Sequence, residues 1–277
     1  MTMPADPWET DRLDLAGYLA RLGVPERAPS RAALDELHEA HVRTFTFDNL
    51  DVLLDQHRGV DLDPVQAKFV GRGRGGYCFE HSTIFAAALQ RLGYDVRRRL
   101  GRVGDPGAGT QQGRTHMVVE VLLDDERLLC DTGFGTSRLR PIALADGAED
   151  DYLGWRHQVR RTPDGGWGLL RHRDGAWELT HTTDELDVLP VDVAMGHHWT
   201  STFPGSHFRS GLMLARHLPD RHVVVTGETV TVRRPGQPTE HRDLADGELQ
   251  DWLGVLDVPL TWDEETRLLK RVAALRG

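Results

Sequence analysis

Three residues of this chain have the types and the order that an activated cysteine nucleophile requires. Cys78 follows a glycine-rich run at 71–76, His116 precedes a β-like run, and Asp131 begins the sequence Asp-Thr-Gly-Phe-Gly. In such a set a thiolate attacks the substrate, an imidazole moves protons and a carboxylate orients the imidazole. The three residues therefore predict covalent nucleophilic catalysis.

Cys78 stands at the start of a segment with helical apolar periodicity. A cysteine in the first turn of a helix meets unpaired backbone N–H groups and the positive end of the helix dipole, which favour the thiolate. Gly75 and Gly76 are expected to let the backbone bend and to leave room for a substrate. The alternative is a buried structural cysteine, because free cysteines are among the most buried residues.

The register of one hairpin decides whether His116 and Asp131 can meet. If residues 124–125 form a two-residue turn, Asp131 falls opposite Val118, which shares a face of its strand with His116. A carboxylate on that diagonal is within side-chain reach of the imidazole. A turn of three residues would move Asp131 to the other register and separate the pair. A catalytic triad therefore predicts the shorter turn.

The elements that must position these residues follow from apolar periodicity. Helical spacing predicts helices over 15–22, from Ser30 to about residue 41, and from Cys78 to about residue 92. Alternation and turn residues predict strands near 118–123, 128–130, 155–161, 167–172 and 176–181. A hairpin over 223–232 and helices near 248–253 and 263–275 complete the chain. The expected class is α+β, with a central meander that closes into a barrel or packs as a curved sheet.

Composition narrows the function classes. The 277 residues include 33 Lys and Arg against 43 Asp and Glu, a net charge of −10. This balance argues against nucleic acid or an anionic membrane as the main partner. Two cysteines make no disulfide framework, and residues 1–6 show no signal-peptide pattern, so we expect a cytoplasmic protein. No apolar run is long enough for a membrane span.

Two other functions for the region around Cys78, dinucleotide binding and zinc binding, have weaker support. Gly71, Gly73 and Gly76 match a dinucleotide-binding fingerprint, with Asp95 near the position of a ribose-binding acid, but no strand is expected before them. A zinc site formed by Cys78, His81 and His116 lacks the usual ligand spacing, so we expect no metal.

Two surface features leave their roles open. Six arginines near the glycine-rich run could contact an anionic cofactor or simply be solvated. An aromatic loop at 203–208 could line a small-molecule pocket or only pack. The arginines are Arg72, Arg74, Arg97, Arg98, Arg99 and Arg102.

Together the motifs resemble those of the arylamine N-acetyltransferases. Residues 74–80 look like the active-site run of that family, and 115–119 and 130–135 look like its histidine and aspartate motifs. Residues 47–52 are similar to its N-terminal motif. The stretch 201–208 resembles the segment that enters its third domain.

The resemblance implies a cysteine-proteinase-like architecture in three parts. An N-terminal helical bundle over 1–95 would carry the nucleophile, a β-barrel over 96–205 would carry the histidine and the aspartate, and an α/β lid over 206–277 would complete the chain. It also implies a ping-pong reaction in which acetyl-CoA acetylates Cys78 and CoA leaves. An arylamine, arylhydrazine or arylhydroxylamine nitrogen then takes the acetyl group. A monomer or homodimer is expected.

The resemblance implies roles for residues around the triad. His116 would activate the thiol and Asp131 would orient His116. The expected substrate-binding residues are Phe47, Phe134 and Phe208. The expected CoA contacts are Arg74, Gly75, Gly133 and Gly135.

The chain departs from the family pattern at Ser82, at Thr132 and at residues 197–199, all of them outside the triad. Other activities remain open. An amide synthase of ansamycin biosynthesis resembles the same fold and would use a carrier-bound acyl thioester. A hydrolase could use the same three residues, and a binding protein could keep them without catalysis.

Overall fold

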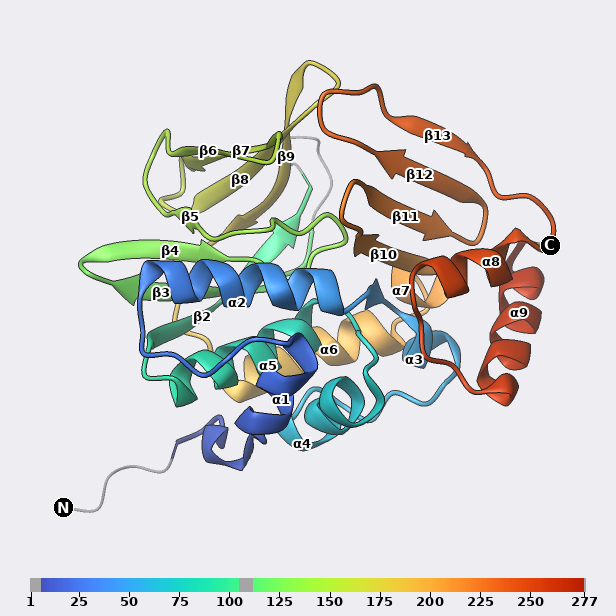
Figure 1. The fold of residues 1–277 in the computed structure, drawn as a ribbon, viewed down its shortest axis with the longest axis horizontal. Helices are drawn as coiled ribbons and strands as arrows, with labels where there is room; N and C mark the ends of the chain where they lie inside the picture. Colours follow the sequence, from blue (N-terminus) through green and yellow to red (C-terminus); the bar gives the residue numbers. More distant parts are fainter. Residues whose placement is uncertain (1–5, 105–111, 277) are drawn as a thin grey trace.

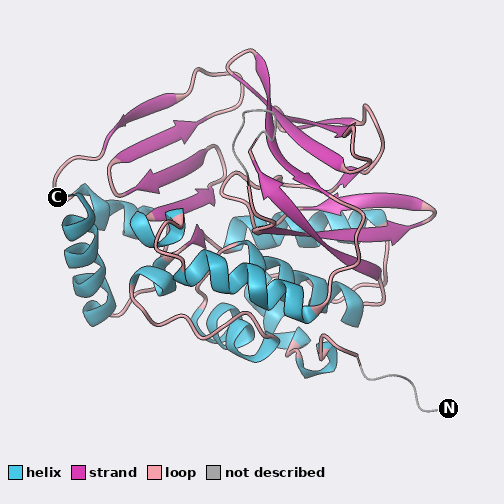
Figure 2. Cartoon of the chain, turned by 180° about the vertical axis from the view of Figure 1, so that it is seen from behind, coloured by secondary structure: helices cyan, strands magenta, loops and turns pink. Residues whose placement is uncertain are grey.

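The structure is a computed structural model that describes residues 6–104 and 112–276. Two β-sheets lie on one side of the molecule and most of the helices lie on the other (Figure 1), and the view from behind shows the same two layers (Figure 2). Residues 1–5, part of the stretch examined for a signal peptide, lie outside the described ranges. Within these ranges, none of the helices combines the length and the apolar character needed to cross a bilayer.

Three longer helices form the N-terminal part. They are α1 (Leu15–Leu22), α2 (Arg31–Thr44) and α5 (Cys78–Arg91). Gly23 ends α1 with a positive φ of 71°, and the Ser30 side chain accepts a hydrogen bond from the Ala33 N–H at the start of α2. Shorter helical turns connect them: η1 (Thr10–Arg12), α3 (Leu50–Leu53), α4 (Leu62–Gln66) and the π-helical turn η2 (Ala67–Gly71).

The central sheet has eight strands in the order β5-β4-β3-β2-β9-β8-β7-β6. Its edge strands β5 and β6 are joined by residues 144–148, so the sheet curves into a nearly closed barrel. All of its pairs are antiparallel. Its strands are β2 (Asp95–Val103), β3 (His116–Leu123), β4 (Glu126–Cys130), β5 (Ile142–Ala143), β6 (Glu149–Tyr152), β7 (Trp155–Arg161), β8 (Trp167–Arg173) and β9 (Ala176–Thr183).

The second sheet has five strands in the order β1-β10-β11-β12-β13. Its first strand, β1 (Phe47–Asp48), comes from the N-terminal part of the chain and pairs with β10 (Met213–His217). The sheet packs on the C-terminal helices α8 (Glu248–Val255) and α9 (Trp262–Arg276). The remaining elements are β11 (His222–Thr226), β12 (Thr229–Arg233), β13 (Glu240–Asp243), α6 (Pro190–Thr202) and α7 (His207–Ser210).

Helix α5 is the central element of the fold. It is buried along most of its length, and its apolar side packs with α1 and α2 on one flank and with β3 and β4 on the other. Burial of its Ile84, Phe85 and Leu89 removes apolar surface from water, at about 1.5–3 kcal/mol for each large side chain. The helix that carries Cys78 is therefore held rigidly between the bundle and the barrel.

The expected α+β class is confirmed, with a helical bundle, a nearly closed barrel and a C-terminal sheet with helices. The predicted strands and helices are present within a few residues of their expected ends. Helix α6 was not predicted, because Gly196, paired histidines and threonines are poor helix formers. Packing holds it in place, since Gly196 lies against the ring of Phe79. The domain limits after residues 95 and 205 remain a prediction.

Candidate active site

Cys78 is the first residue of α5. The Tyr77 N–H before it donates to the Glu80 carboxylate at 3.1 Å, which satisfies one of the unpaired donors at this helix end. The thiol donates to the backbone oxygen of Thr115 at 3.4 Å, so it points at the start of β3. Only 3% of Cys78 is exposed. The thiol is thus placed at the positive end of α5 and beside the barrel.

Gly75 and Gly76 have a packing role that the sequence did not reveal. The N–H of Gly76 donates to the Thr46 carbonyl and its own carbonyl accepts from Asp48, which docks the run on β1. A Cβ at Gly75 would lie 1.7 Å from the Thr46 oxygen, and one at Gly76 would lie 2.2 Å from the Glu80 carboxylate. The expectation that these glycines leave room for a substrate is therefore wrong: their missing side chains let β1 approach the nucleophile.

The β3–β4 hairpin confirms the register that the triad requires. Leu123 pairs with Glu126, so Asp124 and Asp125 form a two-residue turn, and both have positive φ, at 50° and 62°. Positive φ at both central positions is typical of a type I′ hairpin turn. The pair Val119–Cys130 then places Asp131 next to the start of β3.

His116 and Asp131 meet in a buried contact. The His116 Nε2 lies 3.2 Å from the Asp131 Oδ1, and both side chains are 1% exposed. Because Nε2 faces the carboxylate, Nδ1 is the ring nitrogen left to face the thiol. The Phe134 ring packs against His116 with 5.1 Å between centroids. The structure therefore brings together Cys78 of α5, His116 of β3 and Asp131, which directly follows β4.

The charges at this site support one another. Burial opposes an imidazolium, but the Asp131 carboxylate and then Cys78 favour it, and together they raise the pKa of His116 to about 10. Burial also opposes the carboxylate, yet His116 and His181 hold the pKa of Asp131 well below its usual range. By contrast, burial raises the pKa of the Cys130 thiol, so Cys130 stays protonated and inert.

His181 is a site residue that sequence reasoning missed. It lies on β9, and its Nε2 is 3.0 Å from the second carboxylate oxygen of Asp131. Only the long-range pairing of β2 with β9 brings it there, so local patterns in the sequence carry no signal for it. His116, Asp131 and His181 also form the one set of side chains in the described residues that could hold a metal, with ligand atoms within 4.8 Å of one another. That set coincides with the triad and is not a separate site.

The three phenylalanines expected to bind substrate surround the triad. Phe47 and Phe208 share an apolar cluster with Cys78, with 6.1 Å between their ring centroids. Phe134, which follows Asp131, is half-buried and packs on both histidines of the site. Gly133 is buried against Cys78, whereas Gly135 is half-buried beside the Phe47 ring. The structure therefore places three aromatic rings near the triad, and their role in substrate binding stays a prediction.

Arg74 and Gly75 are both buried among other groups of the protein. The guanidinium of Arg74 is 1% exposed and donates to Asp51 at 2.6 Å and to Glu264 of α9 at 2.7 Å. Gly75 is buried under Thr46. Their positions do not support the expectation that they contact CoA, because their neighbours are already protein groups. We assign both a structural role.

The six arginines do not form one surface cluster. Arg98 is buried with its guanidinium 4.0 Å above the Trp8 ring, and Arg99 is buried against Glu120. Adjacent residues of β2 point to opposite faces of the sheet, so the sequence cluster is divided. Arg72 joins Arg74 in the ion pairs with Asp51 and Glu264.

The structure does not support a dinucleotide-binding site or a zinc site in this region. A π-helical turn, not a strand, precedes the glycine-rich run, and Asp95 begins β2. His81 is occupied by core contacts, with its Nε2 3.0 Å from the Thr46 oxygen and its Nδ1 2.8 Å from His41. It therefore has no nitrogen left for a metal.

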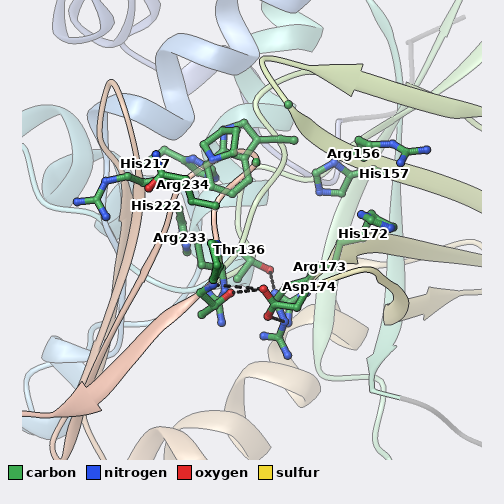
Figure 3. A pocket seen from close by; sticks show the side chains of 18 of the residues that line it. Thr136, Arg156, His157, His172, Arg173, Asp174, His217, His222, Arg233 and Arg234 are labelled. Carbon is green, nitrogen blue, oxygen red and sulfur yellow. Dashed lines mark hydrogen bonds and ion pairs between the residues drawn. The ribbon is translucent and has the colours of Figure 1, made fainter.

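A basic cavity of about 570 Å³ lies between the barrel and the C-terminal sheet (Figure 3). The Thr136-Ser137 part of its wall continues directly from Gly135, so one loop links the cavity to the triad. Among the side chains that line it, Asp174 is the one acid. Arg233 has two buried nitrogens, Nε and Nη1, without a hydrogen-bond partner among the described residues. The basic lining residues are Arg156, His157, Arg171, His172, Arg173, His217, His222, Arg233 and Arg234.

Comparison with known proteins agrees with this architecture. The N-acetyltransferase family matches residues 31–257. The chain is 34% identical to the arylamine N-acetyltransferase of Escherichia coli (strain K12) over 83% of this chain and 82% of that protein. The arylamine N-acetyltransferase structure from Mycobacterium abscessus superposes with a TM-score of 0.91 at 33% identity and covers 99% of each chain. That of Mycobacterium marinum in complex with CoA superposes with a TM-score of 0.88 at 31% identity, covering 95% of this chain and 99% of that one.

The fold and these matches define the class: the protein is an acyltransferase. More narrowly, the chain belongs to the arylamine N-acetyltransferase family.

Proposed function

We propose that the chain transfers an acetyl group from acetyl-CoA to the nitrogen of an arylamine, arylhydrazine or arylhydroxylamine, through an acetyl-Cys78 intermediate. The observation that carries this proposal is the buried contact of His116 with Asp131 beside a thiol at the N-terminus of α5. A protonated imidazole and a helix N-terminus both stabilise a thiolate. The family of the chain supplies the class of reaction.

In the first half-reaction the Cys78 thiolate attacks the carbonyl carbon of acetyl-CoA. The new carbon–sulfur bond forms at Cys78 and the bond to the CoA sulfur breaks. The CoA thiolate takes the proton that His116 held as imidazolium, and free CoA leaves. Asp131 keeps His116 oriented while the proton moves.

In the second half-reaction the acceptor nitrogen attacks the acetyl-Cys78 carbonyl. His116, now neutral, takes the proton that the nitrogen loses, and Cys78 leaves as a thiolate. The imidazolium–thiolate pair of the free enzyme is thereby restored. The rings of Phe47, Phe134 and Phe208 form an apolar wall against which an aromatic acceptor can pack.

We place the phosphates of CoA in the basic cavity of Figure 3. Burial, together with the neighbouring charges of Arg171 and Arg173, lowers the pKa of Arg233 to about 10. A bound anion would offset both the lost solvation of Arg233 and the repulsion from these two arginines. The thioester arm would then run along Gly135 and Gly133 to the thiol. Charge-assisted contacts from arginine are well suited to phosphate groups. These residues replace Arg74 and Gly75 as the proposed CoA contacts.

The setting of the reaction stays a proposal as well. Cys78 and Cys130 are free thiols, which fits a reducing cytoplasm. We propose small molecules and CoA as the partners of a monomer or homodimer.

Initial-rate kinetics tests the mechanism. Acetyl-CoA and an arylamine such as 4-aminosalicylate are varied together, and double-reciprocal plots are expected to give parallel lines. Intersecting lines would contradict a ping-pong order. Release of free acetate at the same rate with and without amine would favour the hydrolase. Inactivity with acetyl-CoA but transfer from a carrier-bound thioester would favour the amide synthase.

A further inference from the structure

We propose that His181 is a positioning residue, which holds the Asp131 carboxylate from its second oxygen so that the first oxygen faces His116. This role rests on the proposed function of the triad. It adds a fourth residue to the site, contributed by a strand that is remote in sequence from the other three.

The geometry gives His181 the better hydrogen bond to the carboxylate. Its Nε2 lies 3.0 Å from the Asp131 Oδ2 with hydrogen-bond alignment. The His116 Nε2 lies 3.2 Å from the Oδ1, an ion-pair distance at which neither atom completes an aligned hydrogen bond. His181 therefore fixes one oxygen of the Asp131 carboxylate and leaves the other oxygen to face His116.

The sheet places His181 on the correct face. Gly101 of β2 pairs with His116 on one side and with Thr183 of β9 on the other. Because side chains alternate along a strand, His181 lies on the same face as Thr183 and thus as His116. The two imidazole rings are 4.7 Å apart between centroids. Asp131 contacts both rings, with one carboxylate oxygen facing each of them.

His181 acts as a neutral donor. Its Nδ1 is buried and has no hydrogen-bond partner among the described residues, so a charged ring would bury an N–H without an acceptor. Burial and the nearby His116 lower the pKa of His181, against the effect of Asp131. The proton of the neutral ring therefore sits on Nε2, where Asp131 accepts it.

The charged groups around this contact are few. Asp131 and His116 act directly on His181. Cys78 lies beyond His116, and His38 and Arg138 interact with Asp131 at longer range. A change in pH response on substitution of His181 is therefore expected to arise through Asp131 and His116.

Two substitutions separate positioning from packing. His181→Phe keeps a ring and removes the donor, whereas His181→Gln keeps an N–H donor near the position of Nε2. Thr180→Val is the matched control, because it removes a buried hydrogen bond of the same strand, from Thr180 to the Leu169 oxygen, without touching the triad.

The readout is alkylation of Cys78 by iodoacetamide, followed by intact-protein mass from about pH 5 to pH 10. This measurement needs neither acetyl-CoA nor an amine, so it remains valid if the proposed transfer reaction fails. The same treatment of Cys78→Ala reports any reaction at Cys130. Thermal unfolding of each variant reports packing.

We expect His181→Phe to slow alkylation at pH 7 by at least about tenfold, the scale of one hydrogen bond to a charged group. Without this donor, Asp131 protonates at higher pH and supports the imidazolium less, so His116 stabilises the thiolate less and alkylation slows. His181→Gln and Thr180→Val are expected to keep the wild-type profile. An unchanged profile for His181→Phe, or an equal loss in the Phe and Gln variants, would overturn the positioning role.

Discussion

Gly133 lies directly against the nucleophile: a Cβ at this position would be 2.9 Å from the Cα of Cys78 and 2.8 Å from the Cβ of His81. The loop that follows Asp131 therefore touches the first turn of α5 backbone to backbone. Such an approach is open only to glycine. The absence of a side chain at Gly133 therefore sets how closely the thiol approaches the histidine–aspartate pair.

Gly133→Ala is expected to push α5 and the Asp131 loop apart. We expect a loss of stability of about 1–3 kcal/mol from overpacking, together with at least a tenfold fall in acetyl transfer. Gly254→Ala is the control, because a Cβ there meets open space in helix α8. Chemical denaturation and initial rates on the two variants check this. Wild-type activity in Gly133→Ala would show that the thiol tolerates displacement.

Arg74 is predicted to stabilise the fold and not to bind CoA. Arg74→Met removes a buried cation that pairs with both Asp51 and Glu264, which is expected to cost about 3–5 kcal/mol even though the buried Lys68 still pairs with Asp51 at 3.2 Å. Arg72 contacts the same two carboxylates but is 46% exposed in its side chain, so Arg72→Met is expected to cost at most about 1 kcal/mol. Urea denaturation measures both. Equal losses would show that burial does not set the contribution of this network.

Local patterns accounted for much of the fold but not for its long-range pairings. The start of α5 at Cys78 and the hairpin turn at residues 124–125 were predictable, because caps, periodicity and turn length act over a few residues. The membership of β1 in the C-terminal sheet was not, since it depends on a partner, β10, far along the chain.

In the candidate site, too, local features were predictable and long-range contacts were not. The types and order of Cys78, His116 and Asp131 could be read from the sequence, and the hairpin register was predicted only on the condition that they form a triad. His181 reaches the site through the long-range pairing of β2 with β9. Arg74 was expected to contact CoA because it stands beside the Cys78 motif in the sequence, whereas its neighbours in space are Asp51 and Glu264. Sequence proximity to a motif is therefore a poor guide to the direction of a long side chain.

The basic cavity predicts a loss of donor affinity that depends on the phosphates. Arg233→Ala is expected to raise the KM for acetyl-CoA by about tenfold, as one charge-assisted contact is lost. S-acetyl-N-acetylcysteamine, a thioester without phosphates, is the control donor, and its kcat/KM is expected to be unchanged. An equal loss with both donors would place the effect at the thiol and remove the cavity from CoA binding.

The pH dependence of stability follows from the buried histidines. Burial lowers the pKa of His38 to about 3 and the pKa values of His81 and His217 to about 4. In the unfolded chain the same groups titrate near about pH 6.5, so between about 4 and 6.5 the unfolded state binds more protons. The free energy of unfolding is therefore expected to fall as the pH drops through this window.

His116 affects the free energy of unfolding above about pH 6.5. Its raised pKa of about 10 means that its contribution is full below about pH 6.5 and is lost as the pH rises toward 10. Stability is thus expected to peak near pH 6.5. Urea denaturation at several pH values measures the curve, and His217→Gln is expected to make its acid side less steep. A free energy that keeps rising from pH 6.5 to pH 4 would contradict the buried neutral histidines.

The central claim is that Cys78 carries the acetyl group. The most direct test is intact-protein mass after wild type and Cys78→Ala are each mixed with acetyl-CoA alone. We predict a single acetyl adduct on the wild type, none on Cys78→Ala, and loss of the adduct with formation of the N-acetyl product when an arylamine is added. An acetyl adduct on both proteins, or transfer to the amine by Cys78→Ala, would contradict the covalent mechanism.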